Sequence, residues 1–426
     1  MQFDSTKDDD SNCKKLRFDF HDEWINTTIG KVATVVSGGT PSTKIPQYWE
    51  GDINWYTPSE IGKNKYVFSS KRKISKEGLD NSSAKLLPKN TILLSSRATI
   101  GETSISMNES TTNQGFQSLI VNSDVDLNFI YYLIESNKRN LLKKATGSTF
   151  REISSKEIKK LEIKIPTLNE QKKIGTMLSS VDQKIELIKQ QLNQTTKFKQ
   201  FLLQHLFANK SSESNELHKL RFENENGEDF SKWKYYNIED LIDEISEKST
   251  INNQYDILSS TREGIVLQDD YFNRDIASKD NTGYKILRKN QLVLSPQNLW
   301  LGNININFDF EIGLVSPSYK VYNINEDILL VNFLNCIIKT PRMVYEYKCA
   351  SEQGASVVRR NLNKKLFNKI KIKIPSIEEQ EKIASFLSSV DQKIDLINQQ
   401  LNQTTKFKKY LLQHLFINIT HQYISY

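Results

Sequence analysis

The chain has 426 residues, of which 37% are hydrophobic and 26% are charged, and its 58 basic and 51 acidic residues give a net charge of +7. This length allows two to three domains, and the mild positive charge permits a polyanionic partner without requiring one. The three cysteines, Cys13, Cys336 and Cys349, fit neither a disulfide framework nor a CxxC motif and therefore favour a reducing compartment.

No segment of the sequence resembles a targeting or membrane-spanning element. The first residues are polar and acidic, unlike a signal peptide. The most apolar run, DILLVNFLNCIIKT at 327–340, is too short and too often interrupted by asparagine to span a bilayer. We therefore expect a soluble, cytoplasmic protein with no membrane partner.

The first predicted domain covers residues 1–165. It mixes β-like runs, such as NTILLSS at 90–96 and LEIKIP at 161–166, with helical stretches such as DLNFIYYLIES at 126–136. Short strands alternating with helices in this way predict an α+β fold.

Basic and aromatic residues are interleaved between positions 43 and 73 of this domain. The mixture suits contacts with DNA phosphates combined with groove or base contacts. The alternative is a solvated surface over aromatic core residues, which we favour for Trp49 and Trp55. The basic candidates for DNA contacts in this stretch are Lys44, Lys63, Lys71 and Arg72.

A long helix is predicted for residues 166–210. Thr167 stands three residues before Glu170 and follows a proline, which fits a capping box at the start of a helix. Apolar residues then recur at alternating spacings of four and three, the pattern of a coiled-coil seam. From Leu168 to Phe207 such a helix would be about 60 Å long. The seam residues are Ile174, Leu178, Val181, Ile185, Ile188 and Leu192.

The second predicted domain covers residues 211–374 and repeats the first faintly, at an offset of 200. DNSSAKLLPKNTILLS at 80–95 aligns with DNTGYKILRKNQLVLS at 280–295. We therefore expect a second α+β domain built on the same framework.

Different side chains stand beside this shared framework in the two domains. Arg97 occupies the place where Gln297 and Asn298 stand in the second domain. Arginine reads guanine through two hydrogen bonds, whereas asparagine or glutamine suits adenine. Such a pair of domains would suit two different DNA half-sites, but each residue alone is equally well explained as a hydrogen-bonding loop residue. Further candidates for DNA contacts in the second domain are Arg262 and Arg274.

A second helix, predicted for residues 375–420, repeats the first almost letter for letter. When Glu170 is aligned with Glu379, only eight of 38 residue pairs differ, and LNQTTKFK occurs in both copies. Ser376 stands three residues before Glu379, as in the first capping box. The seam residues are Ile383, Leu387, Val390, Ile394, Ile397 and Leu401.

The apolar stripe of each helix needs a partner, and the other helix is the obvious one. The first helix delivers the chain to its far end, where residues 211–374 must fold before the second helix begins. A parallel pair would force this compact domain to bridge about 60 Å. We therefore predict an antiparallel coiled coil, with the two domains related by a pseudo-twofold axis of the kind that DNA offers to proteins.

Motifs of catalysis are absent from the sequence. There is no P-loop, no GxGxxG after a strand, no HExxH and no pair of adjacent prolines, so the (Asp/Asn)-Pro-Pro-(Tyr/Phe) motif of adenine methyltransferases is missing. His205 and His414 end the two long helices, where we interpret them as packed residues and not as metal ligands. We therefore predict no catalytic residue, metal or cofactor in this chain, which argues against an autonomous methyltransferase or nuclease.

The arrangement and three motifs resemble the specificity subunit of type I restriction-modification enzymes. The motifs are the repeated EQxKIxxxLSSVDQKI, SGGTPSTKIPQYWEGDINWYTPSEIG at 37–62, and TTNQGFQSLI at 111–120. The last motif makes Asn113 and Gln114 candidates for DNA contacts. The second domain has LVSPSYKVY in the corresponding place, which adds Tyr319.

This resemblance implies a non-catalytic subunit in which each variable domain reads one half of an asymmetric bipartite site in double-stranded DNA. The helices would then act as a ruler and as a docking surface for partners. Two methylation subunits would supply S-adenosylmethionine binding and adenine methylation, and restriction subunits would supply ATP- and Mg²⁺-dependent translocation and cleavage. The alternative is a coiled-coil scaffold that binds proteins and has no DNA specificity.

Overall fold

The computed structural model divides the chain into two compact units. Unit 1 comprises Met1–Gln190 and Gln399–Tyr426, and unit 2 comprises Gln191–Asn398. Within the described residues, no helix is both long enough and apolar enough to cross a membrane. The structure describes residues 16–146, 151–207, 220–271, 280–353 and 360–416.

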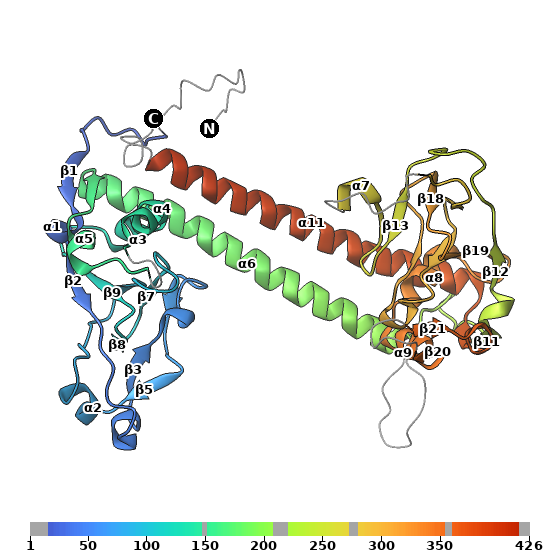
Figure 1. Cartoon of the computed structure of the whole chain (residues 1–426), viewed down its shortest axis with the longest axis horizontal. Helices are drawn as coiled ribbons and strands as arrows, with labels where there is room; N and C mark the ends of the chain where they lie inside the picture. Colours follow the sequence, from blue (N-terminus) through green and yellow to red (C-terminus); the bar gives the residue numbers. More distant parts are fainter. Residues whose placement is uncertain (1–15, 147–150, 208–219, 272–279, 354–359, 417–426) are drawn as a thin grey trace. The chain divides into compact units, whose positions relative to one another are not determined.

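A five-stranded sheet with the order β2-β9-β6-β7-β4 lies at the centre of unit 1, and its strands β2, β9 and β7 are labelled in Figure 1. Because side chains alternate along a strand, Ile92 and Leu94 of β6 face α3, while Leu93 faces a second cluster around Phe116. Both faces of the sheet are therefore covered. The strands are β2 (Ala33–Ser37), β4 (Tyr66–Val67), β6 (Thr91–Leu94), β7 (Thr103–Ser106) and β9 (Gln117–Val121).

Smaller elements complete the first domain. A three-stranded sheet has the order β5-β3-β8, and β1 pairs with β10. The strands of these two sheets are β1 (Ile25–Thr28), β3 (Ile53–Tyr56), β5 (Arg72–Ile74), β8 (Ser110–Thr112) and β10 (Glu162–Ile165). The helices are α1 (Ile29–Val32), η1 (Pro46–Trp49), η2 (Pro58–Glu60), α2 (Lys76–Asp80), α3 (Leu127–Ser136), α4 (Lys138–Lys144) and α5 (Ser155–Lys159).

The central sheet of unit 2 repeats four strands of the first sheet, in the order β12-β19-β16-β17. Asn90 and Asn290 occupy equivalent left-handed turns, with φ of 64° and 63°, one and two residues before the start of β6 and β16 respectively. Each donates its backbone N–H across the hairpin over 2.7 Å, to Ser106 and Asn307 respectively. The faint repeat in the sequence is therefore one hairpin framework used twice. Its strands are β12 (Ile242–Ile245), β16 (Leu292–Leu294), β17 (Ile304–Ile306) and β19 (Lys320–Ile324).

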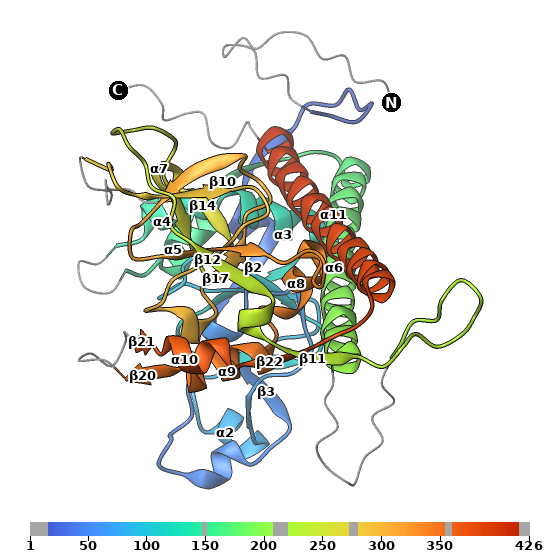
Figure 2. The ribbon, with the colours of Figure 1, turned by 90° about the vertical axis from the view of Figure 1, so that its right-hand side faces the viewer.

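The other elements of unit 2 surround this sheet, and α9, α10, β20 and β21 lie together (Figure 2). The remaining strands are β11 (Lys234–Asn237), β13 (Leu258–Ser260), β14 (Ile265–Leu267), β15 (Lys285–Arg288), β18 (Ile312–Val315), β20 (Ser351–Gln353), β21 (Arg360–Leu362) and β22 (Lys371–Ile374). The helices are η3 (Ile238–Asp240), α7 (Gln268–Tyr271), η4 (Leu299–Leu301), α8 (Val331–Ile337), α9 (Pro341–Cys349) and α10 (Lys364–Asn368).

Each unit contains part of both long helices, α6 (Leu168–Leu206) and α11 (Ile377–Leu415). In unit 1 the start of α6 packs against the end of α11, because Ile174 and Leu178 share one core with Leu411 and Leu415. That core also includes α3 of the first domain, so the helices and this domain form one folded body within unit 1.

Unit 2 uses the opposite ends of the same helices. Leu202 and Leu206 at the end of α6 share a core with Ile383 and Leu387 at the start of α11. The two helices therefore run in opposite directions in both units, which confirms the antiparallel prediction and the α+β fold class. All twelve predicted seam residues are buried or half-buried. The four leucines near the helix ends, Leu202, Leu206, Leu411 and Leu415, belong to the same contacts although the seam pattern had not included them.

The glutamates predicted to close capping boxes have another role. Glu170 has no exposed surface and accepts hydrogen bonds from Arg17 Nε, over 2.9 Å, and from Trp24 Nε1, over 3.3 Å. The second copy repeats this arrangement with Glu379, Arg221 and Trp233. A buried carboxylate requires such partners because its desolvation is costly. The Ser376 side chain keeps its expected role, since it accepts a hydrogen bond from the Glu379 N–H over 3.4 Å.

Candidate nucleic-acid interface

The SGGT segment at 37–40, which begins at the last residue of β2, is held against two neighbouring loops of unit 1. A Cβ on Gly38 would lie 2.0 Å from the Asn113 carbonyl oxygen, and a Cβ on Gly39 would lie 2.3 Å from the Ser83 backbone. Only glycine allows this close approach of backbones. As a result Thr40 Oγ1 reaches Gln114 and donates a hydrogen bond to its Oε1 over 2.7 Å.

Three sequence-predicted residues, Arg97, Asn113 and Gln114, come together in this loop cluster. The Ser96 N–H donates to the Gly115 carbonyl over 2.7 Å, which places Arg97 beside the Asn113–Gly115 turn. Asn113 stabilises that turn, because its Oδ1 accepts the Gly115 N–H over 2.9 Å. We refer to the loops around Arg97, Asn113 and Gln114 as the first loop cluster.

The guanidinium of Arg97 is half exposed and has one carboxylate partner. Its Nε lies 3.0 Å from Glu152 Oε1, and 50% of the Arg97 side chain remains accessible. An ion pair at such an exposed position contributes little to stability. Arg97 can therefore leave Glu152 at little cost and bind an acceptor outside the protein.

A second basic group surrounds Trp49. The Arg72 guanidinium stacks over the Trp49 ring, with 3.5 Å between its carbon and the ring centroid. Trp49 Nε1 donates to the Ser42 carbonyl over 3.2 Å, which holds the loop carrying Lys44 nearby. Trp55 is only 4% exposed, so it belongs to the core, as we had favoured.

Lys63 and Lys71 are both exposed, and each lies in an anchored loop. The Lys71 N–H donates to Glu60 Oε1 over 2.7 Å, and the other oxygen of Glu60 accepts the Thr57 N–H. Lys63 follows Gly62, whose N–H donates to Ser104 Oγ over 3.0 Å. These lysines thus extend into solvent from fixed backbone positions.

In unit 2, Gln297 and Asn298 occupy the loop after β16 that corresponds to the Arg97 loop after β6. The Ser95 N–H donates to Glu102 and the Ser295 N–H donates to Asn303, so the two loops leave equivalent hairpins. Gln297 is exposed, and Asn298 precedes η4. The same framework therefore carries an arginine in unit 1 and two carboxamides in unit 2.

Arg262 and Tyr319 lie close to Ser260, a buried polar residue of unit 2. Tyr319 Oη donates to the Ser260 carbonyl over 3.4 Å, and burial raises the pKa of Tyr319. Ser260 Oγ donates to Asn303 Oδ1 over 2.7 Å, which connects this group to the loop of Gln297 and Asn298. Arg262 is exposed two residues after Ser260. We refer to the loops of Arg262, Gln297, Asn298 and Tyr319 as the second loop cluster; Arg274 lies outside the described residues.

Sequence reasoning missed two residues of these clusters. Glu152 pairs with Arg97 from 55 positions away, and no local motif marks it. Arg360 lies beside Gln297, because its N–H donates to the Gln297 carbonyl over 3.3 Å, and its guanidinium carbon is 5.0 Å from the Trp300 ring. The basic pair RR at 359–360 was the only available signal.

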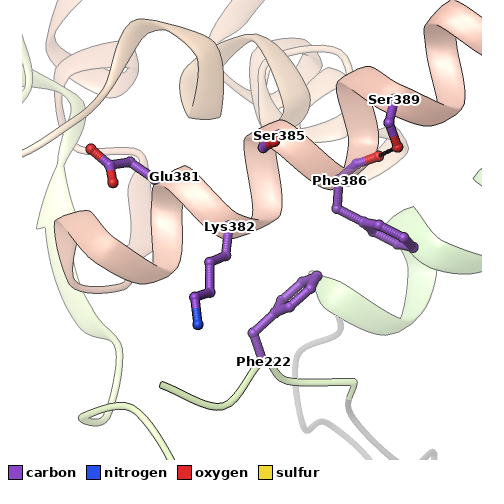
Figure 3. Close-up of a pocket in the computed structure, with 6 residues that line it drawn as sticks. All are labelled: Phe222, Glu381, Lys382, Ser385, Phe386 and Ser389. Carbon is purple, nitrogen blue, oxygen red and sulfur yellow. Dashed lines mark hydrogen bonds between the residues drawn. The ribbon is translucent and has the colours of Figure 1, made fainter. Parts of the chain in front are cut away.

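A shallow groove of about 540 Å³ lies along the first turns of α11 in unit 2 (Figure 3). The rings of Phe222 and Phe386 meet there edge to face, with centroids 5.7 Å apart. The sequence repeats place Phe18 and Met177 at the equivalent positions of unit 1. The groove is lined by Phe222, Glu381, Lys382, Ser385, Phe386 and Ser389.

Comparisons with known proteins identify both halves of the chain. Residues 21–197 and 230–406 each match the family described as the type I restriction modification DNA specificity domain. The MjaIX type I restriction enzyme specificity subunit of Methanocaldococcus jannaschii is 40% identical over 173 residues, which cover 40% of this chain and 40% of that protein. The EcoR124I/EcoR124II specificity subunit of Escherichia coli is 32% identical over 167 residues, which cover 38% of this chain and 41% of that protein. The aligned part thus spans only about two fifths of either relative.

Solved structures extend the similarity of fold to nearly the whole chain. The S subunit of a type I restriction-modification system from M. genitalium has a TM-score of 0.56 at 19% identity and covers 95% of this chain and 98% of its own. A chain from a structure on complex assembly and conformational transition of the type I R-M system has a TM-score of 0.55 at 14% identity and covers 94% and 99%. At these identities the comparison shows the fold.

Proposed function

This chain belongs to the type I restriction-modification DNA specificity family, and from that premise we propose that it is the non-catalytic DNA-recognition subunit of a type I restriction-modification enzyme. It binds an asymmetric bipartite site in double-stranded DNA, and each loop cluster reads one half. The recognition domains are residues 1–165 and 211–374, and the spacers between the half-sites are residues 166–210 and 375–420.

One observation carries this proposal. Two equivalent hairpins end in loops with different side chains, Arg97 in unit 1 and Gln297 with Asn298 in unit 2. A duplicated framework with divergent exposed hydrogen-bonding groups is what the reading of two different half-sites requires.

The other candidate residues divide by chemistry. Exposed lysines and arginines suit phosphate contacts, while carboxamides and tyrosine suit base edges or sugars. We assign phosphate contacts to Lys44, Lys63, Lys71, Arg72 and Arg262 and, on its side-chain chemistry alone, to Arg274, which lies outside the described residues. We assign base or sugar contacts to Asn113, Gln114 and Tyr319.

Partners supply the chemistry in this proposal. Two methylation subunits in the cytoplasm contribute S-adenosylmethionine binding and adenine methylation, and restriction subunits contribute ATP- and Mg²⁺-dependent cleavage. The apolar groove at Phe222 and Phe386 has equivalent residues in unit 1. This repetition supports two copies of one partner protein, with one copy bound to each unit.

The function is tested by expressing the full chain with its methylation subunit and mapping the methylated genomic sites. We expect one asymmetric sequence interrupted by a spacer of fixed length. In parallel, log affinity for a duplex carrying that site should fall linearly with log salt concentration, because bound phosphates release counterions. Absence of site-specific methylation together with salt-independent binding would support the alternative of a protein scaffold.

Replacing Arg97 tests the first loop cluster directly. Arg97→Ala is expected to relax one half-site at a single base pair and to weaken binding there by about 1–3 kcal/mol, the value of one two-bond contact with a base. Methylation mapping of the variant measures the effect, and Lys63→Ala is the matched control for a phosphate contact, expected to weaken all sequences alike. Unchanged specificity in Arg97→Ala would rule out a base contact.

A further inference from the structure

Lys65 connects the first recognition domain to α6 in unit 1. Its Nζ lies 2.7 Å from Ser179 Oγ on α6 and 3.1 Å from the Tyr132 hydroxyl on α3. The Lys65 carbonyl accepts the Ile105 N–H of β7 over 2.7 Å, so the central sheet of the recognition domain carries this side chain. The contact therefore runs from the sheet, through one lysine, to the long helix.

The same network includes α11. The Tyr132 hydroxyl, which is fully buried, donates to Asp182 Oδ2 over 2.6 Å. Lys408 Nζ lies 2.9 Å from Asp182 Oδ1 and 2.9 Å from Glu135 Oε1. The burial of Lys408 opposes its charge, but Glu135 and Asp182 outweigh burial and raise its pKa. Polar groups from the sheet, α3, α6 and α11 thus meet at one place in unit 1.

The equivalent place in unit 2 contains a simpler contact. Asp391 and Lys199 correspond to Asp182 and Lys408 at the period of 209, and they form an ion pair of 2.5 Å. Cys336 of α8 is near enough for Asp391 and Lys199 to act on its pKa, which burial raises, but its thiol donates within its own helix, to the Asn332 carbonyl over 3.3 Å. Among the described residues, the link through Lys65 is therefore found in unit 1 beside a helix contact that both units share.

Burial makes the charge of Lys65 costly, although its ammonium lies 5.1, 5.3 and 4.5 Å from the ring centroids of Tyr66, Tyr131 and Tyr132. Burial lowers the pKa of Lys65 to about 8, which means that the folded protein binds this proton less tightly than the unfolded chain does. The charged form consequently opposes folding at neutral pH. The Tyr132 and Ser179 hydroxyls have hydrogen-bond acceptors besides their contact with Lys65, since Tyr132 donates to Asp182 and Ser179 donates to the Gly175 carbonyl. The hydrogen bond from Lys65 to Ser179 thus exists although the burial of the lysine charge is costly. This combination indicates that the contact serves to orient the sheet on α6.

We propose that Lys65 is a positioning residue that fixes the angle between the first recognition domain and the helix pair of unit 1, and thereby the spacer length that the protein accepts. This inference rests on the proposed function. One additional base pair turns a half-site by about 34° and moves it by about 3.4 Å. The shared core attaches the domain to the helices, and the directional contact from Lys65 to Ser179 sets its orientation on that attachment. A domain without this contact can adjust its orientation within the attachment and tolerate the change.

The test uses the full chain in complex with its methylation subunit. Three DNA substrates carry the same two half-sites, separated by the correct spacer, by a spacer one base pair shorter, or by a spacer one base pair longer. Lys65→Met keeps the apolar stem and removes the charge. We expect both half-site sequences to persist, while the preference for the correct spacer falls by about fivefold or more, the effect of losing roughly one hydrogen bond. Ser179→Ala removes the acceptor on α6 and should shift the preference in the same direction, so it decides the question if Lys65→Met does not fold.

Lys199→Met is the matched control, because it removes a lysine of the helix pair in unit 2 and leaves the Lys65 network intact. It should retain the spacer preference of the unmodified chain. An unchanged preference in Lys65→Met, an equal loss of methylation at all three spacers, or an equal shift in Lys199→Met would overturn the inference. Failure of the unmodified chain to methylate any specific site would instead reject the proposed function.

Discussion

A fragment of residues 1–213 is expected to form a homodimer that reads a palindrome. In the full chain, Leu411 and Leu415 cover the start of α6 in unit 1. The fragment lacks them, but Leu202 and Leu206 are their equivalents at the period of 209, so a second copy can supply the same surface. An antiparallel pair of identical helices is isologous, and the dimer would place two copies of the first recognition domain about a true twofold axis.

Light scattering would give the mass of the fragment, and methylation mapping with the partner subunit would give its site. The expected site is an interrupted palindrome built from the half-site of the first domain. A monomeric fragment, or a dimer that still selects the asymmetric site of the full chain, would show that the two helix copies are not interchangeable.

One substitution distinguishes this dimer from nonspecific association. In the fragment, Lys199 of one copy takes the place of Lys408 against Glu135 and Asp182 of the other copy, and the symmetry repeats the contact. Lys199→Met should therefore weaken the dimer by at least about 2 kcal/mol, or roughly thirtyfold in affinity. In the full chain the same residue makes the partly exposed Lys199–Asp391 pair, so its loss should cost about 1 kcal/mol or less. Equal effects in both proteins would contradict the proposed substitution of one helix end for the other.

Charges introduced into the helix contacts are expected to destabilise both units. Leu178 and Leu387 are 0% and 1% exposed and occupy equivalent positions of α6 and α11. Replacing each by aspartate removes a packed side chain and buries a carboxylate without a partner, at a cost of at least about 4 kcal/mol per site. Thermal unfolding and urea titration of Leu178→Asp with Leu387→Asp measure this loss.

The chain provides a matched control on the same helices. Leu187 and Leu396 are also equivalent to each other and are 58% and 64% exposed. Leu187→Asp with Leu396→Asp introduces the same charges without burying them, and the unfolding midpoint should change little. If the two double variants unfold alike, packing of the antiparallel pair contributes no more to stability than the exposed helix surface does.

The sequence by itself determined the features that depend on local periodicity and repetition. The first long helix was expected from Leu168 to Phe207 and runs from Leu168 to Leu206, because seam spacing and the flanking proline act within a few residues. The hairpin framework was also recognisable, since the turns at Asn90 and Asn290 keep the same residues around them. These local and repeated signals indicated the α+β class, and the length of the first helix together with the compact domain that follows it indicated the antiparallel direction.

Tertiary structure alone decided which distant side chains meet. Glu170 fits a capping box in sequence, yet Arg17, 153 positions away, binds its carboxylate. The carboxylate is buried, and its desolvation is costly unless a cation lies beside it. Lys65 meets Ser179 across 114 positions. Packing also decided that each compact unit contains part of both long helices. An apolar stripe on a helix can be buried by any complementary surface, and only the folded chain selects that surface.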